Sequence, residues 1–125
     1  MQPTENVSLA KTFIAEAAIT KGKAVVLGTS AGQVKPPAAA GAKVIGIALE
    51  DAAIGKNVAV CMQGVCAGYA DGAFSKDDVL QAADTNGELD TAASGDYPVG
   101  RALEDATAAG DLVEVFVNPG NVPLA

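Results

Sequence analysis

Apolar and polar residues alternate along several short stretches of this chain, and a period of two indicates β-strands rather than helices. The clearest runs are residues 58–62 (VAVCM) and 113–117 (VEVFV). Residues 77–83 fit either a strand or a short helix. Further strands are predicted, between turn-forming Gly, Asp and Asn residues, at 23–27, 43–49 and 97–103. We therefore predict a mainly β fold, a small barrel or sandwich of short strands.

The chain contains an internal repeat of two copies, which is the most informative feature of the sequence. Residues 46–52 (GIALEDA) recur as residues 100–106 (GRALEDA), and each copy leads through a glycine into one of the two alternating runs. Weaker matches upstream extend the copies to residues 19–62 and 74–117. Two copies are too few for a solenoid, so we expect one domain in which each β unit completes the core of the other.

Residues 1–15 lie outside the repeat and predict an extended N-terminal arm before a single β domain of residues 16–125. The apolar side chains of the arm, which are its candidate contacts with a partner, are Val7, Leu9, Phe13 and Ile14. The alternative is a terminus whose last residues form an ordinary strand. An arm that orders only on its partner predicts that deleting residues 1–12 spares the melting temperature and weakens binding. At the other end, Pro119 cannot donate to a strand ladder, so the last strand should end near Val117.

Composition and charge narrow the range of partners. Half of the residues are hydrophobic, but 26 of them are alanine and there is no Trp, so the chain would gain from burying surface against further copies or a partner. The net charge of −7 is divided into +2 on residues 1–62 and −9 on residues 63–125, which argues against nucleic acid. No apolar run predicts a membrane span. The N-terminus does not resemble a signal peptide, so we expect synthesis in the cytoplasm.

The sequence offers little for catalysis. It has no histidine, which excludes Ser–His and Cys–His pairs, and no phosphate-binding or dinucleotide-binding glycine motif. We therefore expect no enzyme, no cofactor and no metal centre. Cys61 and Cys66 are interpreted as independent buried thiols, unless a bulge at Gly64 changes the face on which one of them lies.

Two acidic pairs, Glu50-Asp51 and Glu104-Asp105, are the most enzyme-like feature. Facing carboxylates can hydrolyse glycosides or bind calcium. However, adjacent residues of a strand diverge, and each pair stands just before small residues and a glycine. A role in turns and solubility is therefore favoured over both chemistries, and amide replacements should cost little stability.

The repeated pattern resembles the capsid decoration, or cement, proteins of tailed phages. The resemblance rests on Gly-x-Ala-Leu-Glu-x-Ala, a following glycine and an alternating valine strand, present at residues 99–117 and, as a second copy, at 44–62. It implies a β-rich homotrimer on the capsid exterior that contacts the major capsid protein and stabilises the expanded head. The arm, with Val7, Leu9, Phe13 and Ile14, would reach along the capsid.

The alternative function is a small carbohydrate- or ligand-binding β module of a fibre or adhesin. Such a module needs a pocket with polar and aromatic side chains. The sequence has five aromatic residues and no Trp, so a sugar-binding module is less favoured than a capsid decoration protein.

Overall fold

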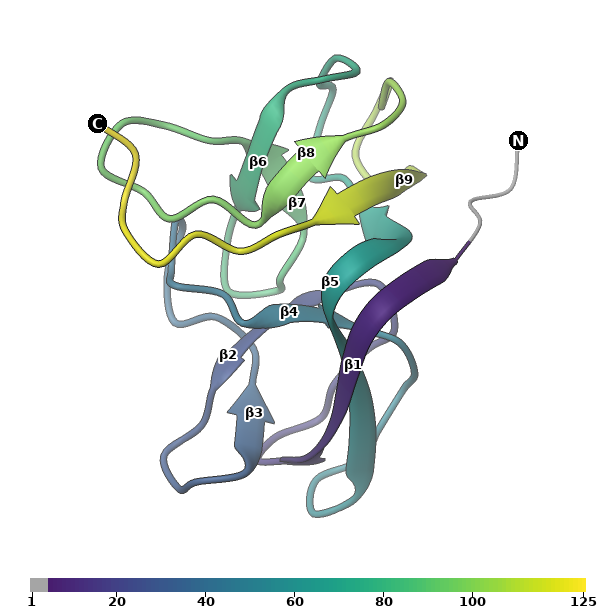
Figure 1. The fold of residues 1–125 in the computed structure, drawn as a ribbon, viewed down its shortest axis with the longest axis vertical. Coiled ribbons are helices and arrows are strands. Elements are labelled where there is room, and N and C mark those ends of the chain that lie inside the picture. Colours follow the sequence, from purple (N-terminus) through teal and green to yellow (C-terminus); the bar gives the residue numbers. More distant parts are fainter. Residues whose placement is uncertain (1–4) are drawn as a thin grey trace.

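The protein folds into nine strands of one sheet, and no helix occurs in residues 5–125, which this computed structural model describes (Figure 1). The mainly β prediction is thus confirmed. The described residues include no helix that could cross a membrane. In chain order the strands are β1 (Asn6–Ala15), β2 (Ala24–Leu27), β3 (Gln33–Lys35), β4 (Gly46–Ala48), β5 (Asn57–Tyr69), β6 (Val79–Ala82), β7 (Leu89–Thr91), β8 (Gly100–Ala102) and β9 (Leu112–Val117).

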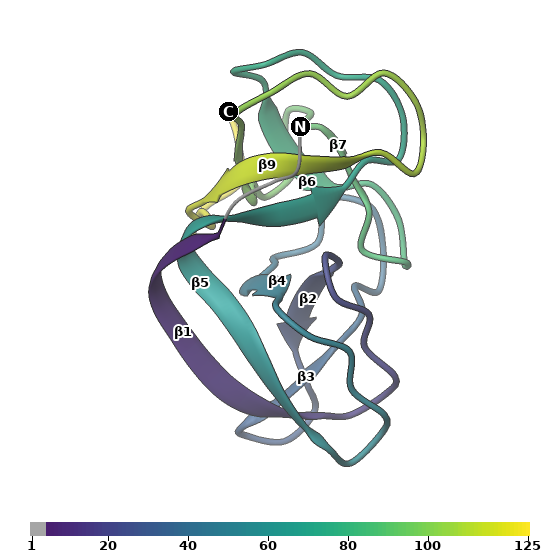
Figure 2. The same cartoon turned by 90° about the vertical axis from the view of Figure 1, so that its right-hand side faces the viewer.

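The sheet folds back on itself and forms two units along the long axis of the molecule. Its strand order is β1-β3-β2-β4-β5-β9-β8-β6-β7, and β1 also pairs with β5. The strands from β1 to β5 therefore form a partial, barrel-like ring, while β6 to β9 extend the sheet from the far half of β5. Figure 2 shows β1 and β5 running side by side and bending from one unit toward the other.

Most of the predicted strands are present, with different lengths. The run at residues 58–62 lies in the much longer β5, and β9 ends at Val117 as expected. Residues 77–83 contain the strand β6 and no helix. The strands β4 and β8 have three residues each, because each pairs with its two neighbouring strands at only two or three positions.

The two sequence copies have the same strand pairings. In the first unit β2 pairs with β3 and β4, and β4 pairs with β5; in the second, β6 pairs with β7 and β8, and β8 pairs with β9. All six pairings are antiparallel, and Gly46 opposite Val25 corresponds to Gly100 opposite Leu80. The sequence repeat is therefore a structural repeat.

The structural repeat is longer than the sequence repeat, because β5 belongs to both units. The end of β1 pairs in parallel with β3 and in antiparallel with the first half of β5. The far end of β5 has the same two neighbours in the second unit, through a parallel bridge from Ala70 to β7 and an antiparallel pairing with β9. The two halves of β5 meet at Gly64, which lies opposite both Val7 of β1 and Val117 of β9.

Residues 1–15, expected to form an arm, contribute a strand of this same sheet over Asn6–Ala15. β1 pairs with β5 from Asn6 to Ile14, with register irregularities on both sides of Leu9. Whether this strand also acts as a capsid-binding arm stays a prediction.

Alanine and valine side chains form two cores, one in each unit. Consecutive residues of β2 and β4 point into different cores: Ala24 and Ile47 into the larger core of the second unit, Val25 and Ala48 into the core of the first. β4 and the first half of β2 are therefore covered on both faces, which explains why β4 is buried throughout. The first unit packs directly against the second, so small side chains of both units are buried together in the larger core.

The repeated motif differs between its copies where the surroundings differ. Ile47 is fully buried, and its Cδ1 would lie 3.4 Å from a Cβ placed on Gly68 in the second unit. The equivalent Arg101 is exposed and forms an ion pair with Asp77, with Nε 3.1 Å from Oδ1. The outer face of the first unit is thus an internal interface, while that of the second meets solvent.

Candidate functional site

The acidic pairs close turns at equivalent places in the two units. Oδ1 of Asp51 accepts the Lys21 amide at 2.8 Å, and Oδ1 of Asp105 accepts the Lys76 amide at 2.7 Å. In the same way, Glu50 accepts the Ala59 amide and Glu104 accepts the Glu114 amide. Each carboxylate is occupied by a backbone N–H, which agrees with the predicted role in turns.

The two thiols are free and buried, as expected, but they interact with each other rather than standing apart. Cys61 and Cys66 are both buried and share a hydrogen bond across the bend of β5. Between them, β5 departs from a regular ladder at Met62, which has no partner in β1, and at Gly64, with φ of +125°. The hydrogen bond with Cys61 and burial both raise the pKa of Cys66 far above its usual range, so that thiol stays protonated.

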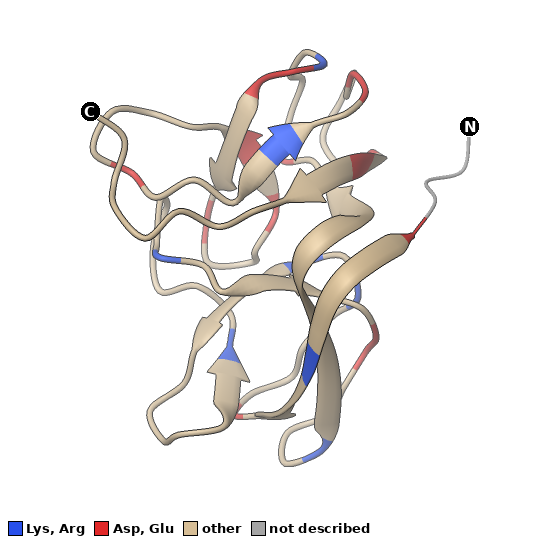
Figure 3. Ribbon diagram, viewed as in Figure 1, with Lys and Arg blue, Asp and Glu red and all other residues tan. Residues whose placement is uncertain are grey.

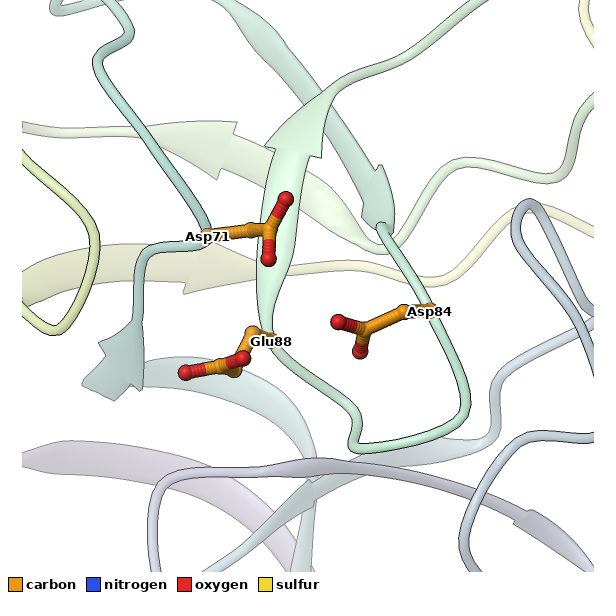
Figure 4. Close-up of side chains that lie close together, drawn as sticks. All are labelled: Asp71, Asp84 and Glu88. Carbon is orange, nitrogen blue, oxygen red and sulfur yellow. The ribbon is translucent and has the colours of Figure 1, made fainter.

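A group of carboxylates that sequence reasoning missed lies at the start of the second unit. Oxygen atoms of Asp71, Asp84 and Glu88 all lie within 4.8 Å of one another, and Figure 4 shows Asp71 and Asp84 pointing toward each other. Loss of hydration and the charges of Asp84 and Glu88 raise the pKa of Asp71. Glu88 also pairs with Lys23 at 3.5 Å. Within residues 5–125 this group has the oxygen ligands that calcium prefers.

The four residues singled out as capsid contacts have different environments. Phe13 is 5% exposed and fills the core of the first unit, at the position that Gly68 occupies in the second. Val7 is half-buried against the larger core. Leu9 and Ile14 are 50% and 44% exposed, so both are accessible to a partner, and their contact with a capsid stays a prediction. Phe13 is not accessible to a partner.

Leu9 lies in an apolar groove of about 450 Å³ at the seam between the units. The groove volume falls within the roughly 300–1,000 Å³ of typical ligand sites. The residues lining it come from β1, β2, the segment before β4, the bend of β5 and the segment after β9; they are Leu9, Val26, Leu27, Lys43, Val44, Ile45, Met62, Gln63 and residues 118–121. No aromatic side chain is among these described residues, so the groove lacks a platform for a sugar ring.

Sequence reasoning found Leu9 but missed Leu27, Ile45 and Met62, which line the same groove. Leu27 is 56% exposed, more than Leu9. One signal was present in the sequence: Leu27 ends an apolar run just before Gly28, where the second copy has Ala82 and Ala83 at the corresponding end of β6. The larger side chain in the first copy could have marked this strand end.

The charges of the molecule are divided between its units. Figure 3 shows most acidic segments around β6, β7 and β9, and most basic segments around the strands of the first unit. Lys43 is the one charged residue among the described residues that line the groove. The groove is therefore less acidic than the second unit, although the whole molecule carries a net charge of −7.

Three comparisons with known proteins bear on this arrangement. No curated protein matches the chain. Among solved structures, the N base of the head fiber protein gp8.5 of bacteriophage phi29 has a similar fold, with a TM-score of 0.68 and 17% sequence identity over 94% of this chain and 98% of that one. The family model for phage cement protein matches residues 1–117, a range that includes all nine strands and both units. The chain therefore belongs to the phage cement protein family and is a structural protein of the phage virion.

Proposed function

We propose that this protein is a non-enzymatic decoration protein that binds the outer surface of a phage capsid and stabilises the expanded head. The observation that carries the proposal is the family match over residues 1–117, which spans both units rather than one motif. The described structure adds a reason from chemistry: its repeated carboxylates accept backbone hydrogen bonds within turns, so they serve the fold.

The major capsid protein is the proposed partner, and a homotrimer the proposed assembly. Exposed apolar side chains such as Leu9 and Leu27 lie beside the seam of the two units, where each could add a modest contact. Contacts of this kind suit a protein that binds in many symmetric copies, because linked copies gain avidity without stronger individual sites. Synthesis in the host cytoplasm and assembly onto the outside of the shell complete the proposal.

Sedimentation with purified shells tests the capsid-binding function. The protein should pellet with emptied, expanded capsids and stay in solution with unexpanded procapsids, and decorated heads should keep their contents to a higher temperature than bare heads. The proposal would be contradicted if the protein bound neither kind of shell, or if it bound both kinds equally well. Sedimentation equilibrium of the free protein measures whether it is trimeric before binding.

A further inference from the structure

The groove at the seam can be compared with the equivalent position of the second unit, where the corresponding side chains are covered. The equivalents of Leu27, Ile45 and Met62 are Ala82, Val99 and Val117, and these three are 0% exposed. In the first unit Leu27 is 56% exposed, and Ile45 and Met62 are only partly buried. The same architectural position is therefore closed in one unit and open in the other.

A non-helical segment of the first unit covers the equivalent position in the second unit. The Gly41 amide donates to the carbonyl of Ala82 at 2.8 Å, and the Gly41 carbonyl accepts the Tyr97 amide at 3.1 Å. Close by in sequence, Val44 is buried in the larger core together with Val99 and Val117. This segment belongs to no strand. It thus covers the end of β6 with a backbone hydrogen bond from Gly41 and, three residues later, places the small apolar side chain of Val44 in the core.

The open groove presents the same backbone acceptor. Alternate carbonyls of a strand point to the same side. Since the Val25 carbonyl accepts the Ile45 amide, the Leu27 carbonyl points toward the groove side, as the Ala82 carbonyl does beyond Leu80. In the described part of the chain, no amide outside the strand ladders donates to the Leu27 carbonyl. The groove is continuous with the interface between the units, because Met62 and Gln63 lie where β5 passes from one to the other.

We propose that this groove binds an extended, acidic segment of the capsid shell, which donates a backbone N–H to the Leu27 carbonyl and packs small apolar side chains against Leu9, Leu27 and Met62. This inference rests on the proposed function. The acidic character follows from Lys43, the one charged side chain among the described residues that line the groove. The extended form follows from the segment that covers the second unit.

The test measures the affinity of variants for emptied, expanded capsids. Leu27→Asp should weaken binding at least tenfold, while Ile54→Asp, the same change at a side chain that is 70% exposed and outside the groove, should bind as the unaltered protein does. Lys43→Glu should weaken binding and lower its salt dependence, with Lys56→Glu as the matched control. The pair Leu9→Ala and Leu27→Ala, combined, tests the groove without a buried charge, and melting curves check that each variant folds.

Each outcome decides between the two proposals. Binding of Leu27→Asp and of the double alanine variant at full affinity would overturn the groove inference and leave the proposed function standing. Failure of the unaltered protein to bind any shell would overturn the proposed function and this inference with it. A free protein whose oligomers dissociate when Leu27 is changed would show that a second copy occupies the groove, which also overturns the shell segment.

Discussion

At the scale of single residues, Asp51 and Asp105 show how a charged side chain can serve the backbone. Each accepts the amide of a lysine at the start of its unit, Lys21 or Lys76, from about thirty positions along the chain. A backbone donor at these turns would otherwise depend on water. The carboxylates thus stabilise the path of the chain.

Asp51→Ala and Asp105→Ala should each lower the free energy of unfolding by about 1 kcal/mol, because each removes one hydrogen bond from an exposed turn. Asn at either position keeps an acceptor oxygen and should cost less than Ala. Urea unfolding measures both, with Lys56→Ala as a control at an exposed turn residue. Indistinguishable Ala and Asn variants would contradict the hydrogen-bonding role.

Asp71 makes a prediction with a definite sign in pH. Its pKa is raised in the folded protein, so its ionised form costs stability there. The contribution of neutral Asp71 to the free energy of unfolding is fully present below the pKa that the residue has in the unfolded chain. It is lost as the pH rises through the pKa of Asp71 in the folded protein. Asp71→Asn should therefore raise the melting temperature at pH 7, and the gain should disappear below about pH 3, where aspartates are protonated.

The control for Asp71→Asn is Asp77→Asn, at an exposed aspartate outside the carboxylate group. Its partner is Arg101, so losing that ion pair should give no gain in melting temperature at pH 7. A gain for Asp71→Asn that is the same at both pH values would mean that packing, and not charge, is responsible.

At the scale of elements, β1 is the strand that closes the first unit. It pairs with β5 along most of its length and places Phe13 and Ala15 in the core. This pairing argues against the expectation that residues 1–12 can be deleted without loss of stability. The deletion should lower the melting temperature markedly, because it removes most of the β1–β5 ladder and leaves an open strand edge.

A matched pair of proline variants tests the ladder without a deletion. Ala15 donates to the Lys56 carbonyl, so by alternation the Lys11 amide points toward β5 and the Thr12 amide points away from it. Lys11→Pro should therefore destabilise the protein more than Thr12→Pro. Thermal unfolding by circular dichroism measures the difference, and equal losses would contradict the assigned ladder.

At the scale of the whole molecule, the two units should unfold as one. They share β5, and Ala24, Val44, Ile47 and Cys61 of the first unit lie in the core of the second. Ile47→Ala should lower the free energy of unfolding by roughly 2–5 kcal/mol, since it leaves a cavity between the units. Ile54→Ala, at an exposed side chain, should have little effect.

Two probes check that this loss is shared. The rings of Tyr69 and Tyr97 lie under Lys23 and Lys43 of the first unit, so tyrosine fluorescence reports on the interface between the units. Far-ultraviolet circular dichroism reports on all strands. The two transitions should coincide for the unaltered protein and for Ile47→Ala. Separate transitions would show that the units fold independently.

Local pattern was enough to predict β2, β4, β5, β8 and β9, the duplication and the family resemblance. Alternation in residues 58–62 and 113–117 is a local property, because successive side chains of any strand face opposite sides whatever its neighbours are. The duplicated GxALEDA motif likewise predicted equivalent turns, and Glu50-Asp51 and Glu104-Asp105 close them in the same way.

How these strands combine depends on the packing of residues that lie far apart in the chain. The pairing of β1 with β5, the burial of Phe13 and the contact of Cys61 with Cys66 depend on residues far apart or on one bend at Gly64. The groove was beyond local pattern for the same reason, since its lining comes from five separate segments. Periodicity records which face of a strand is apolar, but the partner that covers that face is chosen by long-range packing.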